Sequence, residues 1–150
     1  MIIIGYLGVG KSTVSNKNPN YIDFDSSMFP KDDGWEESYV ERAEALSEQG
    51  FTVFVSAHKA VQDLLKNSKE KIIIVYPNLL LREAWIKKLT DRYEKTKFES
   101  DKRALERCIS FYSDDIVELM ELPFPKVELK VSSNYDLEEM LSGVINGRVS

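Results

Sequence analysis

The sequence has little cysteine, little histidine and no long apolar run. Its single cysteine, Cys108, excludes a disulfide framework within the chain and is typical of a protein from a reducing compartment. No apolar run approaches the roughly 18 residues that a membrane-spanning helix needs. The stretch "MIII" is too short for the apolar region of a secretory signal. We therefore expect a cytoplasmic protein without a membrane partner.

Other absences exclude whole classes of nucleotide-dependent protein. The D-x-x-G and N-K-x-D motifs of switch GTPases do not occur, and "NKNP" at 16–19 lacks the acidic residue. Helicases and large ATPases need a longer chain than 150 residues. This length, with 43% hydrophobic and 30% charged residues, is typical of one globular domain.

The net charge of −5 is unevenly distributed. Residues 21–50 contain nine acidic and two basic side chains, whereas residues 82–107 contain nine basic and six acidic ones. An acidic chain is a poor general binder of nucleic acid, because contacts to phosphates dominate that affinity. We expect no stable nucleic-acid partner. The local basic segment suits one compact polyphosphate, although a solvated helix face would have the same composition.

Short apolar runs alternate with amphipathic segments along the chain. Strands are expected at 1–4, 20–25, 51–56, 71–76 and 125–131. Helices are expected from residue 11, at 38–50, at 57–67, at 78–93, in a long segment after 102, and at 134–145. The polar segment 94–102 interrupts the apolar periodicity. This order predicts an α/β fold with a five-stranded parallel sheet and helices on both faces.

Residues 5–12, "GYLGVGKS", fit the Walker A pattern G-x-x-x-x-G-K-[ST]. Backbone N–H groups of such a loop surround the phosphates of a nucleotide, and the helix that follows points its positive end at them. Lys11 would reach the β- and γ-phosphates, and the Ser12 hydroxyl would bind Mg²⁺. The predicted nucleotide-binding residues are Gly5, Gly8, Val9, Gly10, Lys11, Ser12 and Thr13.

Two carboxylates stand at the end of the second predicted strand, in "YIDFDSS". Asp23 and Asp25 are two residues apart, so both point the same way if the strand stays extended. They would bind Mg²⁺ or hold an acceptor hydroxyl, although a solvent-facing polar pair is the alternative. Ser56 occupies the position where many P-loop proteins have the Walker B aspartate. Its lack of a carboxylate favours Asp25 as the acid associated with the metal.

Residues downstream are candidates for binding a second substrate. Trp35 and Tyr39 would stack on a base, and Arg42 is nearly alone as a cation in an acidic segment, as a monophosphate site requires. An interaction of Arg42 with its own helix is equally compatible with the sequence. His58, the only histidine, lies near the strand ends, where it would contact a ligand or serve the structure.

The basic segment supplies candidates for a cover over the phosphates. Arginines on a mobile segment would close over the transferred group and stabilise its transition-state charge. Arg92, beside the interruption in the periodicity, is the first candidate for this catalytic role, and Arg103 and Arg107 follow.

Together, "GYLGVGKST", "YIDFDSS", "FTVFVSAHKAV" and "KIIIVYPNLLLREAWIKKLTDR" resemble the nucleoside-monophosphate-kinase-like group of P-loop kinases. The combination of "IDFDSS", "VFVSAHK" and "IVYP" is particularly similar to small nucleotide kinases encoded by bacteriophages. The resemblance implies one domain over 1–150, strand order 2-3-1-4-5, an acceptor-binding insert at 26–49 and a lid at about 93–103. It also implies ATP and Mg²⁺ as cofactors, with Lys11 and Arg92 as catalytic cations.

The sequence thus predicts transfer of the ATP γ-phosphate to a (deoxy)nucleoside monophosphate. A kinase for a hydroxyl metabolite, with Asp25 as the general base, is the nearest alternative. A nucleotide-binding regulatory protein without turnover is another. The base preference and the choice between monomer and homodimer stay open.

Overall fold

The computed structural model describes residues 1–26 and 29–145, and they form an α/β fold around one parallel sheet. The five strands are β1 (Ile2–Gly5), β2 (Tyr21–Phe24), β3 (Thr52–Val55), β4 (Ile72–Pro77) and β5 (Lys126–Leu129). Their order in the sheet is β2-β3-β1-β4-β5, and each neighbouring pair is parallel. The predicted fold class and strand order are confirmed.

The two central strands are buried on both of their faces. Every residue of β1 and every residue of β4 is buried. Because successive side chains of a strand point to opposite faces, a strand buried throughout must be covered on both sides. The continuous apolar runs "III" in β1 and "IIIV" in β4 are typical of strands that are covered on both faces. The core of the protein therefore extends across both faces of the sheet.

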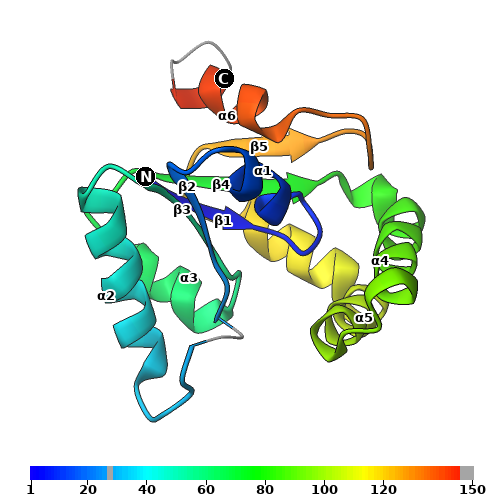
Figure 1. The fold of residues 1–150 in the computed structure, drawn as a ribbon, viewed down its shortest axis with the longest axis horizontal. Helices are drawn as coiled ribbons and strands as arrows, with labels where there is room; N and C mark the ends of the chain where they lie inside the picture. The colour runs from blue at the N-terminus through cyan, green and yellow to red at the C-terminus, as the bar shows by residue number, and fades with distance from the viewer. Residues whose placement is uncertain (27–28, 146–150) are drawn as a thin grey trace.

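Six α-helices of the described chain surround the sheet. They are α1 (Lys11–Lys17), α2 (Trp35–Glu48), α3 (Lys59–Leu65), α4 (Arg82–Thr96), α5 (Glu99–Met120) and α6 (Leu137–Ile145), and a short 3-10 turn, η2 (Leu79–Leu81), precedes α4. Figure 1 shows α2 beside α3 at one end of the molecule, α4 beside α5 at the other, and α6 next to β5. None of the helices in this described part is long and apolar enough to span a membrane.

The pair α4 and α5 differs from the prediction at its tip. The interruption was expected over 94–102, but α4 continues to Thr96 and α5 begins at Glu99. Lys97 closes α4 with a left-handed backbone (φ 55°), and its N–H donates to the Tyr93 carbonyl. Polar residues stay helical here because the tip of a helical hairpin is solvated and needs no apolar stripe. The segment 93–103, predicted as a lid, therefore consists of the end of α4, a tight turn at 97–98 and the start of α5.

Helix α5 is kinked at Phe111, whose φ of −134° and ψ of 16° are not helical. Ile109, two residues before the kink, is 46% exposed. A guanidinium nitrogen of Arg82 donates to the Ile109 carbonyl at 2.8 Å. Arg107 and Asp115 form two hydrogen bonds of 2.8 and 2.7 Å across the bend. Arg107 and Asp115 are eight residues apart, so an unbroken helix would hold their backbones about 12 Å apart.

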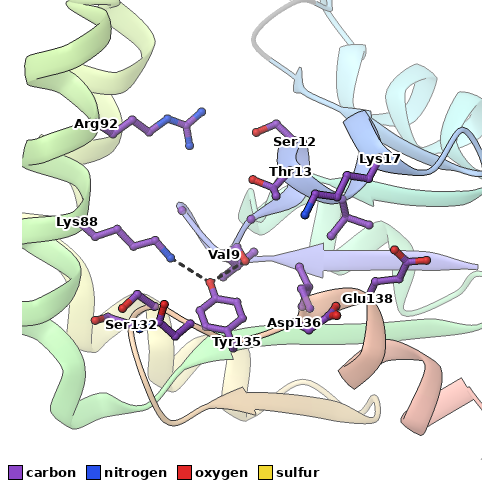
Figure 2. A pocket seen from close by; sticks show the side chains of 16 residues that line it. Val9, Ser12, Thr13, Lys17, Lys88, Arg92, Ser132, Tyr135, Asp136 and Glu138 are labelled. Carbon is purple, nitrogen blue, oxygen red and sulfur yellow. Dashed lines mark hydrogen bonds between the residues drawn. The ribbon is translucent and has the colours of Figure 1, made fainter.

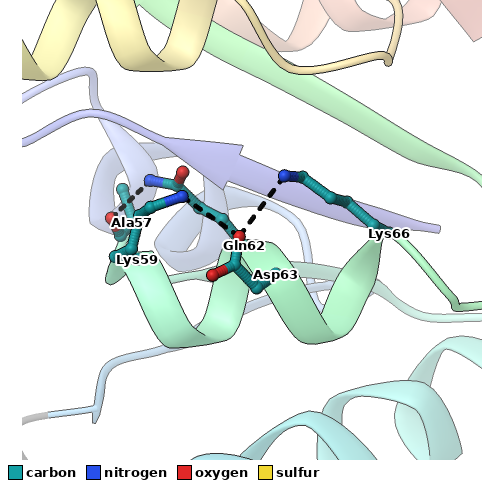
Figure 3. Close-up of polar contacts among 5 residues, drawn as sticks. All are labelled: Ala57, Lys59, Gln62, Asp63 and Lys66. Carbon is teal, nitrogen blue, oxygen red and sulfur yellow. Dashed lines mark hydrogen bonds and ion pairs between the residues drawn. The ribbon is translucent and has the colours of Figure 1, made fainter.

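The junction of β3 and α3 is fixed by a buried glutamine. The Gln62 side-chain amide donates to the Ala57 carbonyl at 2.8 Å (Figure 3). On the exposed face of the same helix, Asp63 forms ion pairs with Lys59 at 3.2 Å and with Lys66 at 3.3 Å. This hydrogen bond from Gln62 holds the carboxyl end of β3, next to His58, in place.

Candidate functional site

The Walker A residues form the connection between β1 and α1. Gly8 and Gly10 have φ values of 79° and 107°, a left-handed conformation that side chains rarely adopt. Val9 between them is fully buried and fastens the loop to the core. The loop thus has the strand–loop–helix context that its motif requires.

Lys11 lies over the base of this loop. A Cβ atom at Gly5 would lie 3.4 Å from the Lys11 Cδ atom, so the lysine stem crosses directly above Gly5. Burial lowers the pKa of Lys11, the carboxylates of Asp23 and Asp25 oppose that shift, and Arg92 adds to it. Asp23, Asp25 and Arg92 are therefore all near enough to Lys11 to act on its charge. The structure thus places the predicted catalytic residues Lys11, Asp25 and Arg92, and the predicted substrate-binding residue Asp23, near the P-loop, and their roles stay predictions.

The two carboxylates are at the carboxyl end of β2, beside the loop. Asp23 is half-buried and Asp25, one residue beyond the strand, is exposed. Burial raises the pKa of Asp23 and the nearby Lys11 lowers it, with further contributions from Asp25 and Arg92. A hydroxyl at Ser12 and one or two carboxylates are the oxygen donors that Mg²⁺ uses together with substrate phosphates and water. The donors present therefore fit the implied metal.

Arg92 occupies a position within α4 rather than at its end. Its Nε atom pairs with Asp101 of α5 at 3.0 Å, and Asp101 is only 8% exposed. Thr96 donates a second hydrogen bond to the same carboxylate. Figure 2 shows the Arg92 side chain extending from α4 toward Ser12 and Thr13. The guanidinium thus faces the loop, and its ion pair with Asp101 holds it in that position.

A pocket of about 450 Å³ adjoins the loop. Its walls come from residues of the P-loop, from Lys88 and Arg92 of α4, and from the segment 132–138 after β5 (Figure 2). The Lys88 ammonium donates to the Tyr135 hydroxyl at 3.0 Å, and this hydroxyl donates to the Val9 carbonyl at 2.8 Å. The pocket has the size and position for the nucleoside part of a nucleotide whose phosphates lie in the loop.

Sequence reasoning missed Tyr135 and gave Lys88 no particular role. Two signals pointed to them. Tyr135 follows the carboxyl end of β5, and the carboxyl ends of parallel strands meet at the edge of the sheet where ligands bind. Lys88 lies three residues after the buried Trp85 on α4, so both reach the same side of that helix.

A polar network lies at the ends of β2 and β3, on the predicted acceptor side. The Ser56 hydroxyl accepts from the Ser26 N–H at 3.2 Å, and the Ser26 hydroxyl lies 3.1 Å from His58 Nε2. The Trp35 ring meets the His58 ring edge-on at 5.6 Å. Although His58 is exposed overall, partial burial of its ring lowers its pKa, and the cations Lys31 and Arg107 lower it further. In place of a Walker B acid, Ser56 thus anchors the backbone beside Asp25.

Other predicted acceptor residues have different surroundings from those expected. Tyr39 is fully buried, with its ring stacked on Phe24 at 4.6 Å, so it presents no face to a base. Its hydroxyl donates to the Phe24 carbonyl and accepts from the Ser56 N–H, because a buried phenol needs both partners. Tyr39 is a structural residue that joins β2 to β3. Arg42 is exposed on α2 and Arg103 is exposed on α5.

The insert predicted at 26–49 includes Ser27 and Met28, which lie outside the described residues, as do residues 146–150 of the predicted domain. Most of its described part is the helix α2, which begins at Trp35 rather than at residue 38. The acceptor and lid assignments remain predictions.

No protein-family model matches this sequence, and no curated protein matches it either. Among solved structures, the fold is similar to that of a shikimate kinase from Bacteroides thetaiotaomicron, with a TM-score of 0.52 and 14% identity over 98% of this chain and 95% of that one. An uncharacterized protein from Eubacterium ventriosum ATCC 27560 has a TM-score of 0.51 and 9% identity over 98% of this chain and 96% of that one. At these identities the likeness is one of fold.

Proposed function

We propose that this protein is an ATP-dependent phosphotransferase that moves the γ-phosphate of ATP to a (deoxy)nucleoside monophosphate. The observation that carries the proposal is the convergence of Lys11, Asp23, Asp25 and Arg92 around the P-loop. Phosphoryl transfer needs little covalent chemistry from a protein, but it needs cations on the transferred group and a positioned acceptor. A simple binding loop does not require an arginine from a distant helix beside two carboxylates.

Each residue of this set has a distinct part in the proposed reaction. Lys11 and Arg92 would hold the β- and γ-phosphate oxygens and stabilise the charge that develops during transfer. Ser12 and Asp25 would hold the Mg²⁺ ion, which would neutralise phosphate charge while bound. Asp23 would keep Lys11 charged despite its burial. The paired helices α4 and α5 would limit the access of water.

The groups around His58 support the proposed acceptor class. An acceptor that already carries a phosphate needs a cation beside its binding surface, and an aromatic ring suits its base. Lys31 lies 4.5 Å from the centre of the Trp35 ring, and both Lys31 and Arg107 act on His58. Lys31, beside the Trp35 ring, is our first candidate for the acceptor phosphate, and Arg42 stays a further candidate. Arg107 is already bonded to Asp115.

A hydroxyl metabolite is the second candidate acceptor. Asp25 is exposed at the end of β2, where a carboxylate could accept the proton of an alcohol. The similarity of fold to a shikimate kinase favours this alternative.

The deciding experiment measures ADP release from ATP and Mg²⁺ with a panel of nucleoside monophosphates, deoxynucleoside monophosphates and hydroxyl metabolites. Release that depends on a monophosphate supports the proposal, and Lys11→Met is the matched control that should abolish it. Release with hydroxyl metabolites alone would favour the second candidate. Tight ATP binding without turnover would indicate a regulatory nucleotide-binding protein.

A further inference from the structure

Two carbonyl groups of the P-loop are held from outside the loop. The Trp85 indole N–H donates to the Leu7 carbonyl at 2.7 Å, and the Tyr135 hydroxyl donates to the Val9 carbonyl at 2.8 Å. The donors come from α4 and from the segment after β5, far from the loop in the sequence. Each carbonyl is therefore directed toward its donor, the Leu7 carbonyl toward α4 and the Val9 carbonyl toward the segment after β5.

A trans peptide unit directs its C=O and its N–H in opposite directions. Both peptide units are trans, so a bond that holds the Leu7 carbonyl also sets the direction of the Gly8 N–H. The same argument links the Val9 carbonyl to the Gly10 N–H. We propose that Trp85 and Tyr135 are positioning residues that keep these two N–H groups turned toward the phosphates. This inference rests on the proposed binding of a nucleotide at this loop.

Lys88 completes the second of these contacts. Its ammonium lies 4.3 Å from the centre of the Trp85 ring and 5.0 Å from that of Tyr135. It also donates to the Tyr135 hydroxyl, as Figure 2 shows. An ammonium has only donors, so the tyrosine oxygen must accept from Lys88 and use its single proton on Val9. Lys88 thus fixes the direction of the hydroxyl bond, and it acts on the phosphate site through Tyr135.

Helix α4 also packs closely against the loop at Gly8. A Cβ atom at Gly8 would lie 2.9 Å from a methyl carbon of Leu89 and 3.3 Å from the Trp85 indole nitrogen. There is no room for the peptide unit to move toward α4. The loop is held by contact on one side and by two hydrogen bonds.

The test measures the affinity for inorganic tripolyphosphate, which has no base, together with that for ATP, by titration calorimetry. Tyr135→Phe removes one oxygen from a half-buried ring and should weaken tripolyphosphate binding about fivefold to tenfold, as expected for one lost hydrogen bond. Lys88→Met should weaken tripolyphosphate binding similarly, and Lys88→Arg should weaken it less. The double variant Tyr135→Phe/Lys88→Met should bind about as weakly as either single variant. The control, Lys87→Met, changes an exposed lysine paired with Asp91 and should bind normally.

A second readout separates positioning from stability. Addition of tripolyphosphate should shift the amide proton resonances of Gly8 and Gly10, and these shifts should shrink in Tyr135→Phe and Trp85→Phe. A lower melting temperature with unchanged affinity and unchanged shifts would overturn the inference and leave Trp85 and Tyr135 a structural role only. Wild-type protein that binds no tripolyphosphate would also overturn it. Binding without any acceptor-dependent turnover would contradict the kinase proposal alone.

Discussion

Gly8 is constrained both by its backbone conformation and by the close packing around it. Its φ of 79° disfavours any side chain, and the methyl carbon of Leu89 leaves no space for one. Gly34 has almost the same φ, 76°, with nothing within 4 Å of the position of a Cβ. The pair separates the effect of the backbone conformation from that of close packing.

We expect Gly8→Ala to lower the free energy of unfolding by about 2–4 kcal/mol and to abolish measurable nucleotide binding. The matched control Gly34→Ala should lower stability by only about 1 kcal/mol and leave binding unchanged, since it has the strain without the clash. Urea unfolding and calorimetry measure both effects. Equal losses of stability in the two variants would show that Leu89 yields to the added methyl group.

Lys88 makes a pH-dependent contribution to stability. Burial lowers its pKa to about 8, and Arg92 adds to the shift, whereas an unfolded chain has a lysine pKa of about 10.4. Between pH 8 and 10 the unfolded chain therefore binds a proton that the folded chain has released. The contribution of Lys88 to the free energy of unfolding rises with pH across this window. Tyr135, whose ring faces Lys88, has a pKa raised to about 12 and stays neutral in this window.

Urea unfolding of the wild type and Lys88→Met at pH 7.5, 9 and 10 measures this contribution. The difference in stability should move in favour of the wild type as the pH rises. A difference that is constant with pH would show that Lys88 has an ordinary pKa in the folded protein.

At the scale of elements, Arg92 and Asp101 fasten α4 to α5. Asp101 is buried and receives hydrogen bonds from both Arg92 and Thr96. Arg92→Ala should therefore lower the free energy of unfolding by about 1 kcal/mol, in addition to reducing turnover by about a thousandfold. Asp101→Asn keeps the cation at the site but removes the negative charge and one of the two acceptor oxygens that Arg92 and Thr96 use, so it should lose stability with a much smaller loss of turnover. Comparable losses of turnover in the two variants would show that Arg92 acts mainly through its ion pair with Asp101, and not through its charge at the site.

Much of the element order could be predicted from the sequence because local pattern determines it. Fully apolar strands such as β4 and the Walker A spacing of Gly5 to Ser12 each indicate their structure without distant partners. The positions of Tyr39 and Tyr135 could not be predicted in this way. One tyrosine is buried by the stacking of Phe24, and the other reaches Val9 from the opposite end of the chain. Their roles depend on tertiary contacts that leave no periodicity in the sequence.

At the scale of the whole molecule, a nucleotide should act as a stabilising ligand. A ligand that binds only the folded state raises the free energy of unfolding by about 2.7 kcal/mol at a concentration of 100 times its Kd. We expect ATP to raise the melting temperature of the wild type by several degrees. It should have no such effect on Lys11→Met, which keeps the loop and lacks the cation. An equal rise in both would place the nucleotide away from the P-loop.

The two bonds that hold the P-loop carbonyls also connect nucleotide binding to the kinetics of folding. They join residues 78 and 126 positions apart in the chain. Such long-range contacts form late, after the closure of large loops, so the folding transition state would have no complete phosphate site. A ligand that binds after the barrier slows unfolding and leaves the refolding rate unchanged. In stopped-flow measurements, ATP should therefore lower the unfolding rate constant alone, and the half-life of the native protein would follow the nucleotide concentration around it.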